Sequence, residues 1–157
     1  MEIQRIKSFE IDHDILMPGF YISRVDGDIT TYDMRTRRPN MGDYMSDLTM
    51  HSVEHMFATY MRNSEIAANV IYFGPMGCQT GFYLLVRDEA PDRVFEVAKN
   101  VLEKIINHDG GMFGASAKEC GNYRCLSLDA AKAECATYLE VLKAKNTVGY
   151  DYPKKEI

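Results

Sequence analysis

The stretch ANVIYFGPMGCQTGFYLLVR, residues 68–87, decides the fold. Its two ends, residues 68–73 and 80–87, are rich in β-branched and aromatic residues, which favour strands. Between them, Gly-Pro-Met-Gly at 74–77 is a turn signal. The stretch therefore predicts two neighbouring strands joined by a short turn, with Cys78 beside that turn.

A second pair of strands is predicted nearer the N-terminus. Residues 20–25 and 28–34 alternate loosely between apolar and polar, and Asp26-Gly27 separates them. This dipeptide suits a type I′ hairpin turn.

Three other stretches show the helical recurrence of apolar residues and begin beside good capping or first-turn residues. These are residues 48–62 with Asp47 or Thr49 as the cap, residues 91–107 with Pro91 in the first turn, and a stretch from the cap Ser127 to about residue 145. Strands gather in the N-terminal half and no βαβ rhythm appears. The expected fold is therefore α+β, a mostly antiparallel sheet with helices packed on one face.

Length and charge limit the function classes. The chain has 157 residues, which predicts a single domain, 1–157, in which 1–7 and 146–157 are expected to be peripheral. Its formal net charge of −5 argues against nucleic acid or an anionic membrane surface as a partner. No apolar run is long enough to span a bilayer, and the first residues do not resemble a signal peptide. We expect a cytoplasmic protein.

Residues 51–55, His-Ser-Val-Glu-His, carry the clearest chemical signal. On a helix, positions i, i+3 and i+4 share one face, so His51, Glu54 and His55 point into one volume. Two histidines at this spacing can bind one divalent ion, and a neighbouring glutamate is placed for proton transfer. The motif is written HxxEH, which also occurs in inverted zincins.

A catalytic metal site needs a third protein ligand and one open position. The downstream candidates are His108, Asp109, Glu119, Cys120, Cys125 and Glu134. Cys120 is favoured because a thiolate is a good ligand for a transition metal and because it lies on a glycine-flanked loop. Cys125 remains a competitor at this point.

The other two cysteines differ from each other. Cys135 lies in an alanine-rich helical run and is expected to be a small buried residue. Cys78 lies beside glycines, where a sulfur can be presented to a site, and a nearby cation would favour its thiolate. A metal with an open position, a thiolate and a spare carboxylate indicate proton shuttling beside a polarised carbonyl. The alternative for Cys78 is a buried residue at a strand end.

The chain resembles the LuxS family of S-ribosylhomocysteine lyases. Six matching segments occur in family order from residue 8 to about residue 140. They are SFEIDH at 8–13, YDMR at 32–35, PN at 39–40, HSVEH at 51–55, PMGCQTGFYL at 75–84 and CGNY at 120–123. The resemblance implies cleavage of the thioether of S-ribosylhomocysteine to homocysteine and 4,5-dihydroxy-2,3-pentanedione, the precursor of autoinducer-2.

The resemblance also implies roles for individual residues. His51, His55 and Cys120 would bind one divalent metal per subunit, ferrous iron in the family, with zinc or cobalt able to replace it. We expect Cys78 to move carbon-bound protons and Glu54 to relay protons between oxygens and to assist the final elimination.

The family forms homodimers with active sites at the interface. Ser8, Phe9, Asp12 and His13 match the segment that completes the partner's pocket, and Arg35 matches a substrate-contacting arginine near the catalytic cysteine. These five residues are therefore the expected substrate-binding residues.

The sequence departs from the family pattern at two places, and two other functions are alternatives to the lyase. Tyr72 replaces an aspartate common in the family, and Arg124-Cys125-Leu126 stands where a histidine is usual. A metallopeptidase of the HxxEH kind would not need Cys78. A non-catalytic metal-binding module would use a fourth protein ligand, such as Cys125.

Overall fold

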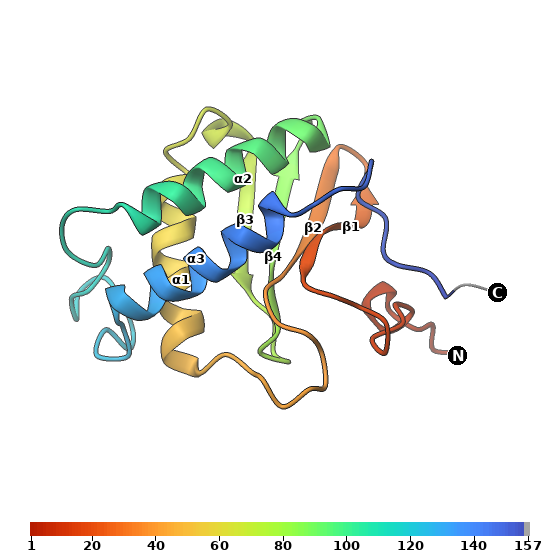
Figure 1. Ribbon diagram of the computed structural model, residues 1–157, viewed down its shortest axis with the longest axis horizontal. Helices are drawn as coiled ribbons and strands as arrows, with labels where there is room; N and C mark the ends of the chain where they lie inside the picture. The colour runs from red at the N-terminus through yellow and green to blue at the C-terminus, as the bar shows by residue number, and fades with distance from the viewer. Residues whose placement is uncertain (156–157) are drawn as a thin grey trace.

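A four-stranded antiparallel sheet forms the centre of the computed structural model, which describes residues 1–155 (Figure 1). Its strand order is β1-β2-β4-β3. The strands are β1 (Gly19–Asp26), β2 (Ile29–Arg35), β3 (Val70–Pro75) and β4 (Gly81–Arg87). Both predicted strand pairs are therefore confirmed, and the two hairpins meet where β2 pairs with β4.

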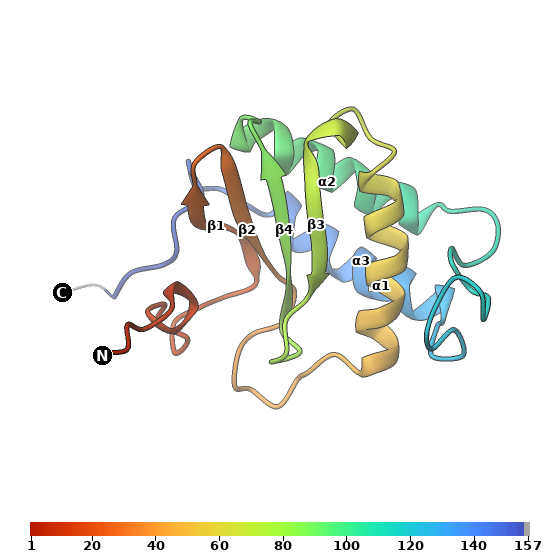
Figure 2. The ribbon, with the colours of Figure 1, turned by 180° about the vertical axis from the view of Figure 1, so that it is seen from behind.

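Three α-helices and two short 3-10 turns complete the fold. The helices are α1 (Asp47–Met61), α2 (Pro91–Ile106) and α3 (Leu128–Lys143), and the 3-10 turns are η1 (Lys7–Phe9) and η2 (Ala67–Asn69). Helices α2 and α3 cover one face of the sheet, and α1 runs beside β3 (Figures 1 and 2). The predicted α+β class, with an antiparallel sheet and helices on one face, is confirmed.

Strand alternation divides the sheet into two chemically different faces. Successive side chains of a strand point to opposite faces. On β2, Tyr32 and Met34 join the hydrophobic core against the helices, whereas Asp33 and Arg35 lie on the other face. Aromatic contacts continue the core towards α1, because the rings of Phe57 and Phe73 are 4.4 Å apart.

Two local predictions are wrong in detail. The side chain that caps α1 is Ser46, whose hydroxyl accepts a hydrogen bond from Thr49 N at 3.1 Å, and not Asp47 or Thr49. In the first hairpin the paired residues Asp26 and Ile29 enclose Gly27 and Asp28, and only Gly27 has positive φ, +60°. This is the pattern of a type II′ turn, with glycine at its first central position, and not the expected type I′. The predicted cap Ser127 is confirmed, because its hydroxyl accepts from Ala130 N at 3.2 Å.

The two terminal segments lie on the β1 side of the molecule (Figure 2). Tyr150 is only 8% exposed, and its carbonyl accepts a hydrogen bond from Ile22 N of β1 at 2.8 Å. Of the segment 146–157, which was expected to be peripheral, residues 156–157 lie outside the described residues. Within residues 1–155 no helix is both long and apolar enough to cross a membrane.

Candidate active site

Helix α1 presents two imidazoles on one face. His51 and His55 are one turn apart, and their ring centroids are separated by 4.6 Å. Each ring is oriented by a backbone carbonyl: Nδ1 of His51 donates to Cys125 O at 2.7 Å, and Nδ1 of His55 donates to Phe113 O at 2.9 Å. A carbonyl only accepts, so both Nδ1 atoms carry the proton and both Nε2 atoms are left as ligands.

Cys120 meets these two histidines from the loop between α2 and α3. Its Sγ lies 3.4 Å from Nε2 of His51, and the ligand atoms of His51, His55 and Cys120 all lie within 4.8 Å of one another. Two imidazole nitrogens and a thiolate are a donor set that suits zinc, ferrous iron or cobalt. Among the described residues this group has three members, which fits a catalytic site with an open fourth position.

Within the described residues, none of the other candidates for the third ligand belongs to the ligand group. His108 uses Nδ1 with the Tyr60 hydroxyl at 2.7 Å and Nε2 with Gly111 O at 2.9 Å. Glu134 pairs with Arg37, and its side chain is 3% exposed. Cys125 contributes its carbonyl to His51, and its thiol is not part of the ligand group.

The loop that carries Cys120 is fitted closely to α1. Gly114 has φ +65°, and a Cβ at this position would lie 3.0 Å from Nδ1 of His55, so the close approach requires glycine. Ser52 is fully buried; its hydroxyl donates to Leu48 O at 2.6 Å and accepts from Ser127 N at 2.8 Å. The adjacent residues His51 and Ser52 thus bind the backbone just before α3.

Glu54 lies on α1 between the two histidines and is partly exposed. Within residues 1–155 its carboxylate has no hydrogen bond or ion pair, and it is not a member of the ligand group. Its place on the helix is that of a group able to exchange protons beside the metal rather than to ligate it.

Cys78 lies at the β3–β4 turn with its side chain exposed. Its Sγ is 3.0 Å from Oγ1 of Thr80 and 3.8 Å from Nη1 of Arg35. Nη1 also donates to Thr80 Oγ1 at 2.8 Å, so the hydroxyl hydrogen of Thr80 is available to the sulfur. A hydroxyl donor and a guanidinium therefore both face the sulfur.

A buried ion pair fixes that guanidinium. Arg35 is 2% exposed and binds the fully buried Asp33 in a two-bond arrangement, Nη2–Oδ2 at 2.6 Å and Nε–Oδ1 at 3.1 Å. Burial lowers the pKa of Arg35, but the charge and hydrogen bonds of Asp33 hold that pKa above its ordinary value. Arg35 is therefore a permanent cation beside Cys78.

The turn that carries Cys78 is bound to the start of α1. Met45 N donates to Gln79 O at 3.0 Å, and the Gln79 amide donates back to Met45 O at 2.9 Å. Met45 directly precedes Ser46, the cap of α1. These bonds bring Cys78 to the end of the helix from which His51 and His55 project.

The four N-terminal candidates lie elsewhere. Phe9 is 65% exposed in η1, and His13 uses Nδ1 on Ile11 O at 2.9 Å. Asp12 accepts from Asp14 N at 3.0 Å, and Ser8 is partly exposed. This segment lies on the β1 side of the sheet, whereas α1 and the loop of Cys120 lie beyond β3 (Figure 2). A single chain does not bring the two groups together.

Three further residues of the site were not singled out from the sequence. They are Asp33, Thr80 and Ser52. For Asp33 a signal existed, because residues two apart on a strand share a face and Asp33 is two before Arg35. For Thr80 and Ser52 no pattern in the sequence predicts the long-range partner.

The family model described as "S-Ribosylhomocysteinase (LuxS)" matches residues 6–148. A protein of Finegoldia magna named S-ribosylhomocysteine lyase is 42% identical over 157 residues, covering 97% of this chain and 100% of the relative. Proteins with the same name from Borreliella afzelii and Phocaeicola vulgatus are 40% and 39% identical, covering 96% and 98% of this chain and all of each relative.

Proposed function

The chain belongs to the S-ribosylhomocysteinase (LuxS) family, and from this premise we propose that it cleaves the thioether of S-ribosylhomocysteine to homocysteine and 4,5-dihydroxy-2,3-pentanedione, the autoinducer-2 precursor. The observation that carries the proposal is that His51, His55 and Cys120 form one ligand group on and beside α1, and that the turn with Cys78 is hydrogen-bonded to Met45, next to the cap of the same helix.

His51, His55 and Cys120 hold the metal in this proposal. The mixed imidazole and thiolate set supports a transition metal, and we propose ferrous iron, with zinc or cobalt able to replace it. When bound, the ion supplies Lewis-acid stabilisation of the negative charge that develops when a proton leaves a carbon beside a carbonyl, worth several kcal/mol. The carbonyls of Cys125 and Phe113 keep both imidazoles in the ligating tautomer.

Cys78 is proposed as the base that moves the carbon-bound protons. Its thiolate, favoured by Arg35 and Thr80, removes a proton beside the sugar carbonyl and returns it to the neighbouring carbon. Glu54 carries the matching protons between the sugar oxygens. Two such rounds move the carbonyl from C1 to C2 and then to C3.

The last step is a β-elimination. With the carbonyl at C3, the proton on C4 is acidic and the sulfur on C5 stands in the β position. Removal of the C4 proton forms the C4–C5 double bond while the C5–S bond breaks, and the sulfur leaves with the electron pair and takes up a proton. The resulting enol at C4 then takes up a proton at C5 and loses its hydroxyl proton, which gives the diketone. Glu54 assists by exchanging protons with the sugar oxygens, and no external oxidant or reductant is required.

Substrate binding and the dimer are proposed together. Arg35, with Ser8, Phe9, Asp12 and His13, would bind the substrate. Because the segment that carries the last four lies at the β1 edge, away from α1 and the loop of Cys120, it is available to complete the site of a second copy (Figure 2). The exposed Phe9, Ile6 and Ile3 of the same segment support such a contact. We therefore propose a homodimer with shared active sites.

A cytoplasmic location is also part of the proposal. Cys78, Cys120, Cys125 and Cys135 are all free thiols, and a thiolate base beside ferrous iron needs a reducing compartment. No nucleic-acid or membrane partner is proposed.

The test is anaerobic incubation of the iron-loaded protein with S-ribosylhomocysteine and titration of the released homocysteine thiol. We expect one thiol and one diketone for each substrate consumed. Absence of thiol release with iron, cobalt and zinc in turn would overturn the lyase assignment. Full turnover by Cys78→Ala would instead contradict the base assignment and favour chemistry of the metallopeptidase kind.

A further inference from the structure

The C-terminal segment contacts the buried Asp33, the partner of Arg35, through the side chain of Tyr152. The hydroxyl of Tyr152 donates to Oδ2 of Asp33 at 2.7 Å, and the Tyr152 ring stacks on Tyr21 with centroids 5.0 Å apart. Burial, and then the charge of Asp33, raise the pKa of the Tyr152 phenol, so that this hydroxyl keeps its proton and donates.

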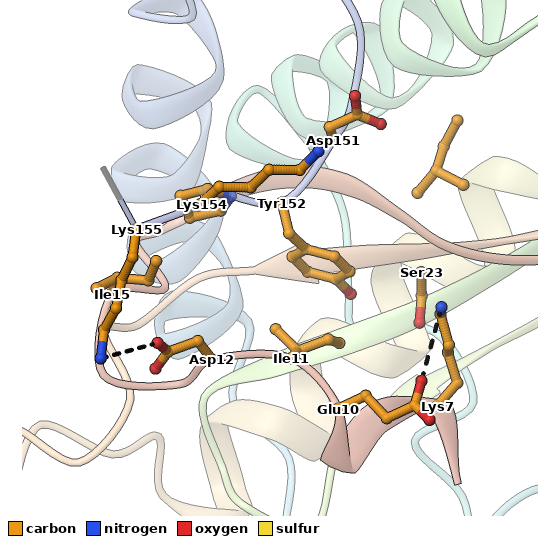
Figure 3. Close-up of a pocket in the computed structure, with 12 residues that line it drawn as sticks. Lys7, Glu10, Ile11, Asp12, Ile15, Ser23, Asp151, Tyr152, Lys154 and Lys155 are labelled. Atoms are coloured by element: carbon orange, nitrogen blue, oxygen red, sulfur yellow. Dashed lines mark ion pairs between the residues drawn. The ribbon is translucent and has the colours of Figure 1, made fainter. Parts of the chain in front are cut away.

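Figure 3 shows the place of this residue. Tyr152 lies in a hollow of about 590 Å³ between the C-terminal segment and the residues around η1, with its ring directed towards Ile11 and Ser23. At the rim, Lys155 lies 3.5 Å from Asp12. The hollow has the dimensions of a binding pocket, but four of its charged residues form two ion pairs, Lys7–Glu10 and Lys155–Asp12. The feature that concerns us is the position of Tyr152 in it.

From Asp33 the contacts continue without a gap to Cys78. Oδ2 of Asp33 receives both the Tyr152 hydroxyl and Nη2 of Arg35, the latter at 2.6 Å, and Nη1 of Arg35 faces Cys78 Sγ at 3.8 Å. Asp33 and Arg35 are buried and lack access to bulk water. Because solvent does not screen this pair, a change in the hydrogen bonding of the Asp33 carboxylate alters its electrostatic interaction with the Arg35 guanidinium.

We propose that Tyr152 is a positioning residue for the catalytic cysteine: it shares the charge of Asp33 with Arg35 and so sets how strongly Arg35 favours the Cys78 thiolate. The proposal rests on the proposed function, in which that thiolate is the base. Without the hydrogen bond from the Tyr152 hydroxyl, the negative charge of Asp33 offsets more of the positive charge of Arg35. The positive electrostatic potential at Cys78 Sγ then falls. The other charged and titratable groups that face Cys78 or the pair are Tyr83 of β4, Tyr21 of β1 and Tyr138 of α3, and all three stay in place.

The test compares Tyr152→Phe with Tyr21→Phe. Each variant loses one hydroxyl from the same ring stack, but the Tyr21 hydroxyl donates to Met17 O and not to Asp33. The readout is the rate of Cys78 alkylation by iodoacetamide against pH, in metal-loaded protein without substrate, with the labelled peptide identified by mass spectrometry. Circular dichroism confirms that both variants are folded.

We expect Tyr152→Phe to move the midpoint of the alkylation profile upward by about half a pH unit or more and to lower the rate near pH 7 about threefold. kcat should fall with it and KM should change less. Tyr21→Phe should leave the profile in place. An unchanged profile in Tyr152→Phe, or an equal shift in both variants, would overturn the proposal. Because no substrate is present, these outcomes are separate from a failure of the lyase assignment.

Discussion

At the residue scale, the properties of Cys78 come from its neighbours rather than from burial. Its thiol is exposed, yet it has a hydroxyl donor at 3.0 Å and a guanidinium at 3.8 Å. Cys135 is the opposite case: it is 1% exposed, and burial raises the pKa of its thiol to about 12. The chain thus contains an accessible, cation-paired sulfur and an inert, apolar one.

Replacing each of these cysteines with alanine separates the two roles. Cys78→Ala should lower turnover by about 10²-fold or more, because a proton-transfer group is lost, with little change in thermal stability. Cys135→Ala should keep turnover and lower the free energy of unfolding by about 1 kcal/mol, because a small core cavity remains. Thiol release and thermal melts measure the two effects. The opposite assignment of effects would contradict the site described here.

At this scale the sequence predicted the grouping of the two histidines with Cys120. His51, Glu54 and His55 share a helical face by spacing alone, so local periodicity was sufficient. The choice of Cys120 over Cys125 needed more, because the two are five residues apart on one loop and only the backbone path shows which sulfur reaches His51. Long-range partners such as Thr80 for Arg35 leave no periodic signal.

At the element scale, α1 is the framework of the site. His51 and Ser52 bind the backbone just before α3, and Met45, next to the cap of α1, binds the β3–β4 turn. Two separate parts of the chain are thus tied to the beginning of one helix. The metal ligands gain their mutual geometry from these bonds as much as from their own spacing.

Ser52→Ala tests this connection. The change leaves the Ser127 amide buried without its partner, which should cost about 1–3 kcal/mol of unfolding free energy. It should also weaken metal affinity about tenfold, since the Cys120 loop is less well held. Thr137→Ala is the matched control, because its hydroxyl donates to Ala133 O within α3 only. Chelator competition for Co²⁺ measures affinity, and equal values in wild type and Ser52→Ala would refute the connection.

The buried thiol of Cys135 on α3 should make the free energy of unfolding depend on pH in alkaline solution. The ordinary pKa of a Cys thiol is 9.0, and that of the folded Cys135 thiol is raised to about 12, so folding favours the protonated thiol. Its contribution to stability is complete below pH 9 and is lost as pH rises from 9 towards 12, at about 1.4 kcal/mol per pH unit. Urea unfolding at several pH values should show wild type losing stability faster than Cys135→Ala above pH 9. Parallel curves for the two proteins would show that this thiol does not contribute.

The sequence predicted which segments form helices and strands better than it predicted their caps and turns. Apolar recurrence located all three helices, because each buries one face against the sheet or a neighbouring helix. The cap of α1 was assigned to the wrong residue because several capping side chains follow one another at residues 46–49. In the first hairpin, Asp26-Gly27 and Gly27-Asp28 are both turn dipeptides, and the pairing of Asp26 with Ile29 selects the second.

At the scale of the whole molecule, the sheet separates two sets of site residues. Helix α1 and the loop that carries Cys120 lie beyond β3, and the N-terminal segment lies on the β1 side (Figure 2). No periodicity in a single sequence reports such a separation, because it depends on strand order. The resemblance to a dimeric family supplied the expectation of a second copy, which stays a proposal.

Co-expression of two inactive variants tests the shared site. In a mixed dimer of Cys120→Ala with His13→Ala, one site has an intact metal group from one chain and an intact His13 from the other. Random pairing should restore about a quarter of wild-type turnover. The control pair, Cys120→Ala with Cys78→Ala, should stay inactive because both changes affect the same chain's half of each site. No recovery in the first pair would show that each chain forms its site alone.

The order of the metal ligands along the chain has a consequence for biosynthesis. His51 and His55 leave the ribosome early, but Cys120 follows only after β3, β4 and α2 have been made. A nascent polypeptide therefore has two imidazoles and no third donor for much of its synthesis, and two histidines alone hold a divalent ion weakly. The complete three-residue ligand group can therefore form only after Cys120 has been made, in the last quarter of the sequence.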